Sequence, residues 1–282
     1  MKIALDPALL NAHPVRTVFD AAARTGYDAV ELGNRDDFVP ANGAVVAGPG
    51  ELAAARDAAR SAGVEIASVA VIQPWSSPDE DIRTRAVARW ADGVRAAVDL
   101  GARRVNSELS GDPNTPQPCR SAFLRSIGTL LPILEREDVV LSVEPHPWDF
   151  LETTASAIDL VREIGSDHVR YLHCVPHAYH LGGSVTDQVR RARGWFDHVH
   201  LADTYRPERT IVNPPGLDHR VHQHFDIGTG ELDWAEVTTA LDAAGFDGLA
   251  TVQVFGWEDR AERSFAANRA ALATLFPAAV NA

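Results

Sequence analysis

Eight short apolar runs, each followed by a stretch with helical character, recur along this chain of 282 residues. The runs are rich in Val, Ile, Ala and Leu and are almost continuously apolar, which is typical of parallel strands that helices cover. The expected strands are Lys2–Asp6, Ala29–Leu32, Glu65–Ile72, Arg103–Leu109, Val139–His146, Val169–Val175, His198–Asp203 and Gly248–Phe255. Eight strand–helix units close into a barrel more readily than they extend as one open sheet. The pattern therefore predicts an α/β fold of the (β/α)8 barrel type.

Glycine residues mark the ends of several expected helices. The Ala-rich segment Glu51–Ser61 is followed by Gly63, and the long segment Asp79–Leu100 is followed by Gly101. Glycine is common just past a helix because it adopts a positive φ without a Cβ clash. No linker of distinct composition interrupts the repeat, so we expect residues 1–282 to form a single domain.

Two connections are too long to be plain turns, and both follow an expected strand. Gly33–Gly50 follows the second strand, and Thr204–Gly230 follows the seventh. Long loops in compact domains are usually functional, and loops after the strands of a (β/α)8 barrel lie on its catalytic face. We therefore expect the functional site at this end of the barrel.

Charge and composition argue against several classes of protein. The formal net charge is −13, with 39 acidic against 26 basic residues, so a basic surface for DNA or RNA is not expected. Cys119 and Cys174 form no motif, which favours a reduced, cytoplasmic protein over a disulfide framework. The N-terminal segment reaches Asp6 and Pro7 too early for a signal peptide. No apolar run approaches the roughly 18 residues that span a bilayer, so no membrane partner is expected.

Four expected strands end in residues that can ligate a metal ion: Glu144, His177, His200 and Gln253. Strand ends in a closed parallel barrel face one mouth, so these side chains can converge on a single ion. Mixed nitrogen and oxygen ligands favour Mn, Zn, Co or Fe over Mg. Each residue also has a structural interpretation without a metal ion. Glu144 would pair with an arginine, His177 would be an ordinary structural histidine, and Gln253 would hydrogen-bond across the barrel.

Other polar residues near strand ends are compatible with either a structural or a functional role. Glu31 and Glu108 end the second and fourth strands, where they either act as acid–base groups or form salt bridges. In "HVHLAD", the two-residue alternation puts His198 and His200 on one side of the strand, with His198 deeper. Asp203 follows and is expected to orient a ligand histidine through its second nitrogen.

A further group is expected to contact a substrate. Histidines cluster at strand ends and in the long loop, Arg220 suits an anionic group, and Trp257 offers an aromatic wall for a sugar. Solvated loop arginines and packed tryptophans are the ordinary alternatives. The expected substrate-binding residues are His146, Arg220, His222, Trp257 and Glu258.

With these residues placed, the chain resembles the sugar phosphate isomerase/epimerase superfamily, the xylose isomerase-like TIM barrels. The resemblance covers essentially the whole chain and is carried by "EPHPWDF", "CVPHAYHLGG", "HVHLADT" and "RVHQHFDIGTGELDW". Within the superfamily, the chain is most similar to the bacterial inositol-catabolism proteins of the IolH type. The resemblance implies a TIM barrel with one divalent ion, held by a glutamate, an aspartate, a histidine and a second glutamate from the last four strand ends.

Carried onto this sequence, the resemblance assigns each position. Glu144 takes the place of the first glutamate, and His200 takes that of the histidine. His177 stands where the aspartate is expected, and His180 matches the substrate-contacting histidine. Gln253 stands where the second glutamate is expected.

The glutamine matters because the related epimerases move a proton with both glutamates. An amide cannot act as a base, so a two-base reaction through Gln253 is not expected. A one-base reaction with Glu144 is consistent with the sequence, with His180 or Glu108 assisting. An epimerisation with a relocated base such as Glu258 is also consistent.

The sequence thus predicts a metal-dependent isomerase or epimerase that acts on a sugar or an inositol-derived keto-polyol. Its chemistry would be proton transfer at the carbon beside a metal-bound carbonyl. The alternatives are a lyase that dehydrates a keto-inositol, and a catalytically impaired sugar-binding barrel. The expected partner is a small-molecule sugar or polyol, and a homo-oligomer is left open.

Overall fold

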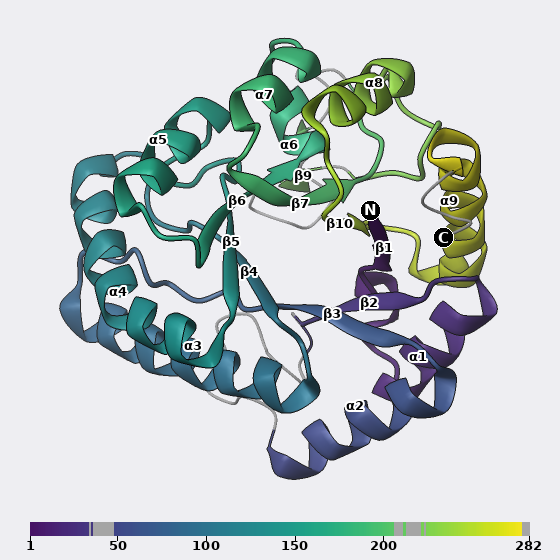
Figure 1. Cartoon of the computed structure of the whole chain (residues 1–282), viewed down its shortest axis with the longest axis horizontal. Coiled ribbons are helices and arrows are strands. Elements are labelled where there is room, and N and C mark those ends of the chain that lie inside the picture. Colours follow the sequence, from purple (N-terminus) through teal and green to yellow (C-terminus); the bar gives the residue numbers. More distant parts are fainter. Residues whose placement is uncertain (34, 36–47, 206–210, 213–220, 223, 278–282) are drawn as a thin grey trace.

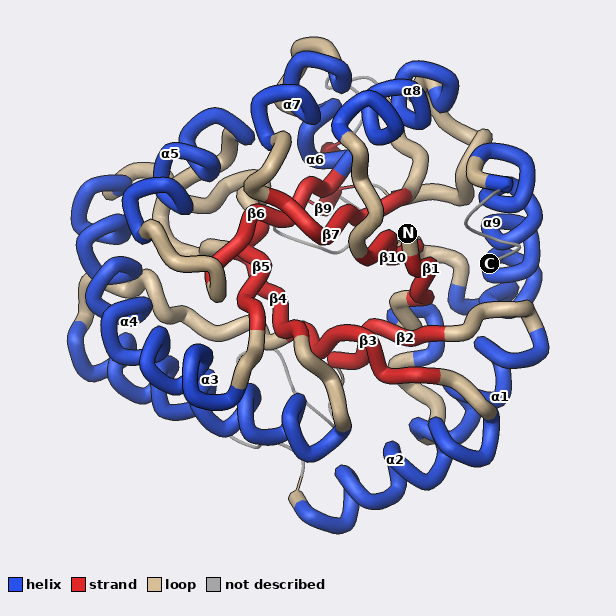
Figure 2. Tube along the Cα trace, in the orientation of Figure 1, coloured by secondary structure: helices blue, strands red, loops and turns tan. Residues whose placement is uncertain are grey.

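Parallel strands form a closed barrel in the order β1-β10-β7-β6-β5-β4-β3-β2, in agreement with the predicted (β/α)8 fold. The computed structural model describes all residues of the chain except 34, 36–47, 206–210, 213–220, 223 and 278–282. Figure 2 shows the ring of strands enclosed by helices. The barrel strands are β1 (Lys2–Leu5), β2 (Ala29–Gly33), β3 (Glu65–Ala70), β4 (Arg104–Glu108), β5 (Val140–Glu144), β6 (Val169–Cys174), β7 (Phe196–Leu201) and β10 (Leu249–Val252).

Helices connect the strands around the outside of the ring (Figure 1). The expected stops are confirmed at Gly63 and Gly101, which both adopt a left-handed conformation just past their helices. A short helix, α6, begins directly at the end of β6 and carries His177. The α-helices are α1 (Val15–Arg24), α2 (Pro49–Ala62), α3 (Glu80–Leu100), α4 (Pro116–Glu137), α5 (Thr154–Ile164), α6 (Val175–His180), α7 (Val185–Ala192), α8 (Trp234–Ala244) and α9 (Ala261–Leu275), with 3-10 turns η1 (Ala8–Leu10) and η2 (Glu258–Arg260).

The strands differ from the expected ranges at their ends. β7 begins at Phe196, two residues before His198, because Phe196 pairs with Tyr171 of β6. Asp197 follows in the strand and forms an ion pair with Arg104 of β4 across the barrel. The sequence suggests a strand boundary at Asp197, because an unpaired charge is unfavourable inside a barrel. In the structure, the ion pair with Arg104 compensates this charge. β5 ends at Glu144, since Pro145 has no N–H with which to continue the ladder.

Inside the barrel, layers of polar side chains alternate with a layer of mostly small apolar side chains. One layer is a separate buried cluster of Ala4, Ala29, Ala67 and Leu249. Small side chains of this kind leave room for polar groups to fill the adjacent layers of the barrel. The larger apolar core lies between the strands and the surrounding helices, as in other barrels with packed interiors.

Gly33 allows β2 and β3 to approach closely near the mouth of the barrel. Its φ is +149°, and a Cβ at this position would lie 2.3 Å from the carbonyl oxygen of Ala70. A larger residue would therefore force the two strands apart at a position that borders the functional pocket.

The long segment after β7 has its own small element. β8 (Ile211–Val212) and β9 (Val221–His222) form a two-stranded antiparallel sheet, and Asp203 bridges to Phe225. Much of this segment, and most of the predicted loop after β2, lies outside the described residues. None of the described helices combines the length and apolar character that a membrane-spanning helix requires.

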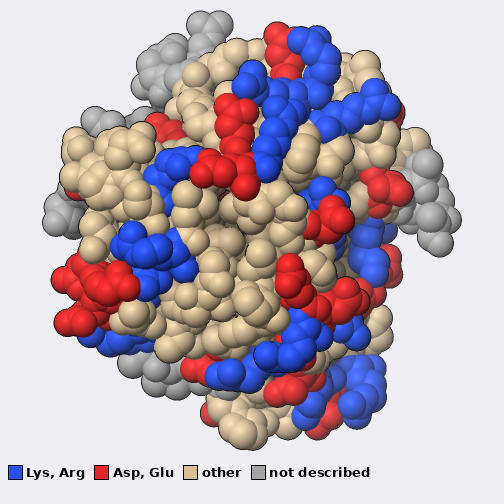
Figure 3. All heavy atoms as spheres, turned by 60° about the vertical axis from the view of Figure 1, so that its left-hand side comes forward, with Lys and Arg blue, Asp and Glu red and all other residues tan. Residues whose placement is uncertain are grey.

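Acidic and basic side chains adjoin one another on the face drawn in Figure 3. Among the ion pairs of the outer helices, Oδ1 of Asp159 of α5 lies 3.7 Å from Nη1 of Arg162 and 3.8 Å from Nη2 of Arg191. Arg120 of α4 forms an ion pair with Glu163 of α5. Acidic neighbours thus partly neutralise the charge of these arginines.

Candidate active site

A pocket at the C-terminal ends of the barrel strands collects most of the sequence-predicted site residues. We call it the mouth pocket. The predicted residues that line it are Glu31, Glu108, Glu144, His146, His177, His200 and Gln253, and they are joined there by Asp6 and Asn106. Carboxylates and imidazoles from β2, β4, β5, β7 and α6 thus meet in one place, together with Asp6 just past β1 and His146 just past β5, as convergence of strand ends in a barrel predicts.

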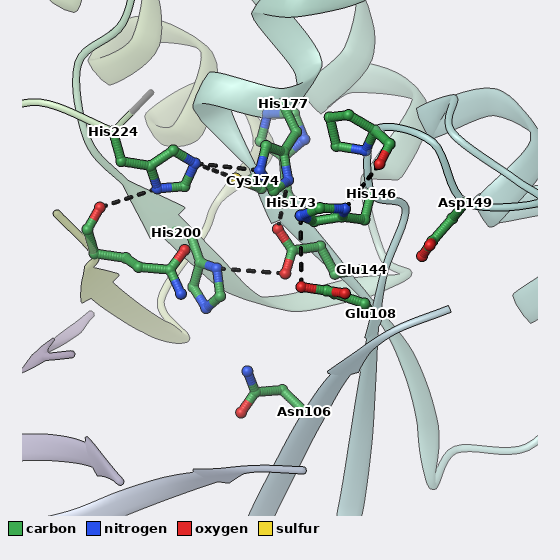
Figure 4. A network of polar contacts seen from close by, with 12 residues as sticks. Asn106, Glu108, Glu144, His146, Asp149, His173, Cys174, His177, His200 and His224 are labelled. Atoms are coloured by element: carbon green, nitrogen blue, oxygen red, sulfur yellow. Dashed lines mark hydrogen bonds and ion pairs between the residues drawn. The ribbon is translucent and has the colours of Figure 1, made fainter. Parts of the chain in front are cut away.

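Glu144 lies between two histidines in this pocket (Figure 4). Its Oε1 is 2.8 Å from Nδ1 of His177, and its Oε2 is 3.6 Å from Nδ1 of His200. All three side chains are buried. Burial alone would raise the pKa of Glu144, but His200 and His177 outweigh this and hold it well below its usual range. Glu144 is therefore ionised in the pocket.

The imidazole of His200 contacts a second buried carboxylate, that of Glu31, on the side away from Glu144. Its Nε2 lies 3.1 Å from Oε1 of Glu31, an oxygen that also accepts from Asn106. The other oxygen, Oε2, accepts from His198 and Thr251. An ionised carboxylate only accepts hydrogen bonds, so Nε2 of His200 carries the proton of this contact. Nδ1 is left to face Glu144 and the pocket. The predicted deeper place of His198 is confirmed, since it is fully buried beside Glu31.

His177 is oriented by a chain of hydrogen bonds that starts at the backbone. Nδ1 of His224 lies 3.0 Å from the carbonyl oxygen of Gln253, which can only accept, so this nitrogen carries a proton. Burial lowers the pKa of His224 well below its usual value, so the ring is neutral and its Nε2 is an acceptor. That nitrogen lies 3.2 Å from Nε2 of His177. His177 therefore donates from Nε2 and directs the lone pair of Nδ1 towards Glu144.

These groups fit a divalent metal ion. Oε1 of Glu144 and Nδ1 of His200 are buried and make no hydrogen bond among the described residues. Together with Nδ1 of His177 they put a carboxylate and two imidazole nitrogens around one point. Burial alone would lower the pKa of His200, but Glu31 and Glu144 raise it well above its usual value, so a proton occupies this place until a divalent cation displaces it. One oxygen and two nitrogen donors suit Zn, Co, Fe or Mn better than Mg.

Gln253 lines the mouth pocket, but its side-chain amide is partly engaged. Its Nε2 donates to Oδ2 of Asp6 at 2.9 Å, which fixes the orientation of the amide. Burial, aided by the nearby charge of Glu31, raises the pKa of Asp6 to about 6. Ligation of a metal ion by Gln253 stays a prediction.

Glu108 lies beside the metal-binding group and belongs to a second cluster. It is aligned with Glu144 in the register of β4 and β5, and its Oε1 is 3.5 Å from Nε2 of His146. Burial raises the pKa of Glu108 and of Asp149. Burial alone would lower the pKa of His146, but the surrounding carboxylates raise it. The cluster therefore retains a proton more readily than isolated carboxylates do.

The other predicted substrate residues lie apart from the mouth pocket or outside the described residues. His180 is close to His177, with ring centroids 6.1 Å apart, but its Nε2 bonds to Thr204 Oγ1 at 3.0 Å, and it does not line the pocket. Burial lowers the pKa of His180 to about 3. Trp257 packs under Arg260, and Glu258 is exposed in η2. Arg220 and the side chain of His222 lie outside the described residues.

The expectation that Asp203 orients a ligand histidine is wrong. Its two oxygens accept hydrogen bonds from the backbone of Thr204, Gly228 and Leu232 and from Nε1 of Trp234. Asp203 therefore anchors the segment that leads into α8. The role expected of it is taken for His200 by Glu31.

Two residues that adjoin the predicted ligands received no role from the sequence. His224 lies in an irregular segment of the long loop, 24 residues after His200, where no strand or helix period predicts its position. The sequence indicates no more for Cys174 than an ordinary reduced cysteine, although this residue is the last of β6. The position of Cys174 at a strand end was the available signal, whereas His224 offered only its residue type.

Comparison with known proteins relates this chain to a family of barrels. Residues 19–271 match the model of a family described as Xylose isomerase-like TIM barrel. The chain is 29% identical over 154 residues to D-psicose 3-epimerase of Enterocloster bolteae, covering 54% of this chain and 43% of that protein. It is 26% identical over 182 residues to L-ribulose 3-epimerase of Mesorhizobium japonicum, covering 61% and 54%. The matched region thus spans about half the length of these curated relatives.

A solved structure of the IOLI protein with a bound zinc atom has the same fold. It superposes with a TM-score of 0.76 and 17% sequence identity, covering 98% of each chain. At this level of identity the likeness concerns the fold.

Proposed function

The chain belongs to the xylose isomerase-like TIM barrel family, and we propose that it is a metal-dependent isomerase or epimerase of a sugar or keto-polyol. The observation that carries the proposal is the meeting of Glu144, His177 and His200 in the mouth pocket, with a second carboxyl group, Glu108, beside them. The two sugar epimerases among the relatives support this class of reaction. The zinc atom named for the IOLI structure supports a metal site in this fold.

Glu144, His177 and His200 would hold the ion, and Gln253 lies close enough to the pocket to add an amide oxygen or to contact the substrate. A divalent ion bound there supplies Lewis acidity, which polarises a carbonyl and makes the adjacent C–H more acidic. Glu31 and His224 hold the two imidazoles so that Nδ1 of each faces the pocket. The protein thus provides a preorganised set of donors.

Glu108 is the group that we propose moves the proton. It lines the mouth pocket, and burial raises its pKa, so it holds a proton more readily than an exposed carboxyl group. His146, whose Nε2 is 3.5 Å from Oε1 of Glu108, can accept that proton. Gln253 stands where relatives are expected to have a second base, so a single carboxyl group would serve in both directions. Proton removal and return at the carbon beside a carbonyl account for isomerisation and for epimerisation.

We propose an inositol-derived keto-polyol as the narrower substrate class. The support is the resemblance of "EPHPWDF" and "RVHQHFDIGTGELDW" to inositol-catabolism proteins of the IolH type. The mouth pocket is lined by carboxyl, amide and imidazole groups, which are the hydrogen-bonding partners that a polyol requires. We further propose that residues 1–282 act as a single domain.

Exchange of solvent deuterium into substrates tests this function. The purified protein, loaded with Zn, Co or Mn, is incubated in heavy water with a panel of ketoses and keto-inositols, and loss of C–H signals is followed by NMR. We expect exchange into at least one member, and its loss after the metal is removed with a chelator. Tight binding of one member without exchange would instead support a sugar-binding barrel. Loss of water from a member would support the lyase.

A further inference from the structure

Cys174 lies inside the group of side chains proposed to hold the metal ion. It is the last residue of β6 and is 2% exposed. Its Sγ belongs to one group with Glu144 and His200, and to another with His177 and His224. Within each group the ligand atoms lie within 4.8 Å of one another. The thiol thus borders all three proposed ligands.

The register of the barrel explains this position. Cys174 is the direct partner of His200 in the pairing of β6 with β7, after a shift of register between Tyr171 and Leu172. Paired residues of neighbouring strands point to the same side of the sheet, so Cys174 and His200 both face the mouth. α6 begins at the next residue and brings His177 over the thiol.

A buried cysteine often acts only as a small apolar side chain. Cys119 is the cysteine of this kind in the chain and serves as the comparison for Cys174. Cys119 is fully buried on α4, and its Sγ contacts the backbone of Asp112 and the hydroxyl group of Thr115. Among the described residues it joins no group of potential metal ligands. Cys174 differs, because its Sγ is 3.8 Å from Nε2 of His224 (Figure 4).

A second observation points to a ligand at this place. Oε1 of Glu144 and Nδ1 of His200 are both buried, and neither makes a hydrogen bond among the described residues. Both belong to side chains that share a group with the thiol. In a tetrahedral zinc site, metal–nitrogen bonds of about 2.0 Å and metal–sulfur bonds of about 2.3 Å separate the ligand atoms by roughly 3.3 to 3.6 Å. The 3.6 Å between Oε2 of Glu144 and Nδ1 of His200 agrees with this spacing, whereas the 2.8 Å between Oε1 of Glu144 and Nδ1 of His177 is a direct contact that would have to lengthen when an ion enters.

We propose that Cys174 is a thiolate ligand of the divalent ion, completing a donor set with Glu144, His177 and His200. On binding, the S–H bond breaks, its proton passes to solvent, and a sulfur–metal bond forms without any change of oxidation state. Thiolate selects zinc, cobalt or ferrous iron over magnesium and manganese. Gln253, held by Asp6, is then available to contact the substrate. The inference rests on the proposed metal-dependent function.

Cobalt(II) alone is the probe, because a thiolate ligand gives a sulfur-to-cobalt charge-transfer band in the near ultraviolet. The full-length protein is titrated with cobalt, and the bound metal is measured separately after desalting. We expect one bound cobalt with this band. Cys119→Ser should keep the band, whereas Cys174→Ser and Cys174→Ala should lose it and bind zinc at least tenfold more weakly, with manganese affinity changed less.

The outcomes separate this inference from the proposed function. Bound cobalt with visible d–d bands but without the charge-transfer band in the unmodified protein would overturn the role of Cys174 and leave the metal site standing. Failure to bind cobalt or zinc at all would overturn both. The spectrum of the unmodified protein decides the question even if a Cys174 variant does not fold.

Discussion

Nε2 of His200 lies 3.1 Å from Oε1 of Glu31, and this contact fixes one side of the imidazole deep in the barrel while the other side faces Glu144. Glu31 is 2% exposed and also bonds to His198. Burial alone would raise the pKa of Glu31, but the two histidines outweigh it and lower the pKa. The carboxylate is therefore charged although it is almost fully buried, and its hydrogen-bond partners compensate the charge.

Replacing Glu31 by glutamine should destabilise the protein strongly. In the metal-free protein Glu31 and Glu144 raise the pKa of His200 well above its usual value, so the substitution keeps the shape but removes one carboxylate partner of a charged imidazole. Loss of one partner of a buried ion pair costs about 3–5 kcal/mol. Urea unfolding measures the change. Glu65→Gln is the matched control, because Glu65 is exposed and pairs with Lys2, so we expect a change of about 0.5 kcal/mol or less. Equal stability of the two variants would contradict the role given to Glu31.

Replacing His224 by phenylalanine should weaken metal binding without removing a proposed ligand. Phenylalanine preserves the ring that stacks on Phe255, with centroids 4.8 Å apart, but it cannot accept the proton of His177 Nε2. We expect zinc affinity to fall about 10–100-fold, as for other residues that orient a ligand. Isothermal titration with zinc gives the value.

His224→Gln provides the matched comparison, because its amide can both accept from His177 and donate to the carbonyl of Gln253. It should retain most of the affinity. His168→Gln, far from the mouth where His168 bonds to the backbone of Val139, should have no effect. If the phenylalanine variant bound zinc as tightly as the unmodified protein, the chain from Gln253 to His177 would have no bearing on the site.

Glu108→Gln should remove activity while the metal stays bound. Glu108 lies outside the proposed ligand set, and loss of a general acid–base group slows proton transfer about 10²–10⁴-fold. Glu144→Gln should instead reduce the metal content itself, since Glu144 is a proposed ligand. Deuterium exchange and metal analysis on the same samples distinguish the two. Normal exchange in Glu108→Gln would move the base to another residue.

Acid should destabilise the fold in part through His173. This residue is fully buried and bonds to the hydroxyl group of Tyr171 at 2.9 Å. Burial lowers its pKa from 6.5 to about 4. The unfolded chain therefore binds more protons between these values, so the free energy of unfolding falls as the pH falls from 6.5 to 4. A shift of this size corresponds to about 3 kcal/mol.

Urea unfolding at pH 7.5 and at pH 4.5 checks this contribution. His173→Phe should lose less stability between the two pH values than the unmodified protein does. His13→Asn, at an exposed position, should behave like the unmodified protein. An unchanged pH dependence in His173→Phe would show that the acid sensitivity arises elsewhere.

The barrel and its helices were predictable because their signals are local. Continuous apolar runs such as Val140–Glu144 predict buried parallel strands, and glycines such as Gly101 predict helix ends. The errors lie at strand ends, as at β7, where Asp197 is compensated by Arg104 from a strand that is distant in sequence. A pattern within one segment contains no information about such a partner.

The sequence by itself determined that Glu144, His177 and His200 would face one mouth, because strand ends of a closed barrel converge whatever their spacing in the chain. Only the tertiary structure decided which groups support them. In the structure, Glu31 and not Asp203 is the hydrogen-bond partner of His200. The pairing register of β6 and β7 places Cys174 next to His200. The reason is that hydrogen bonds and ligand groups depend on separations of a few ångströms across strands and loops, whereas periodicity specifies only the face on which a residue lies.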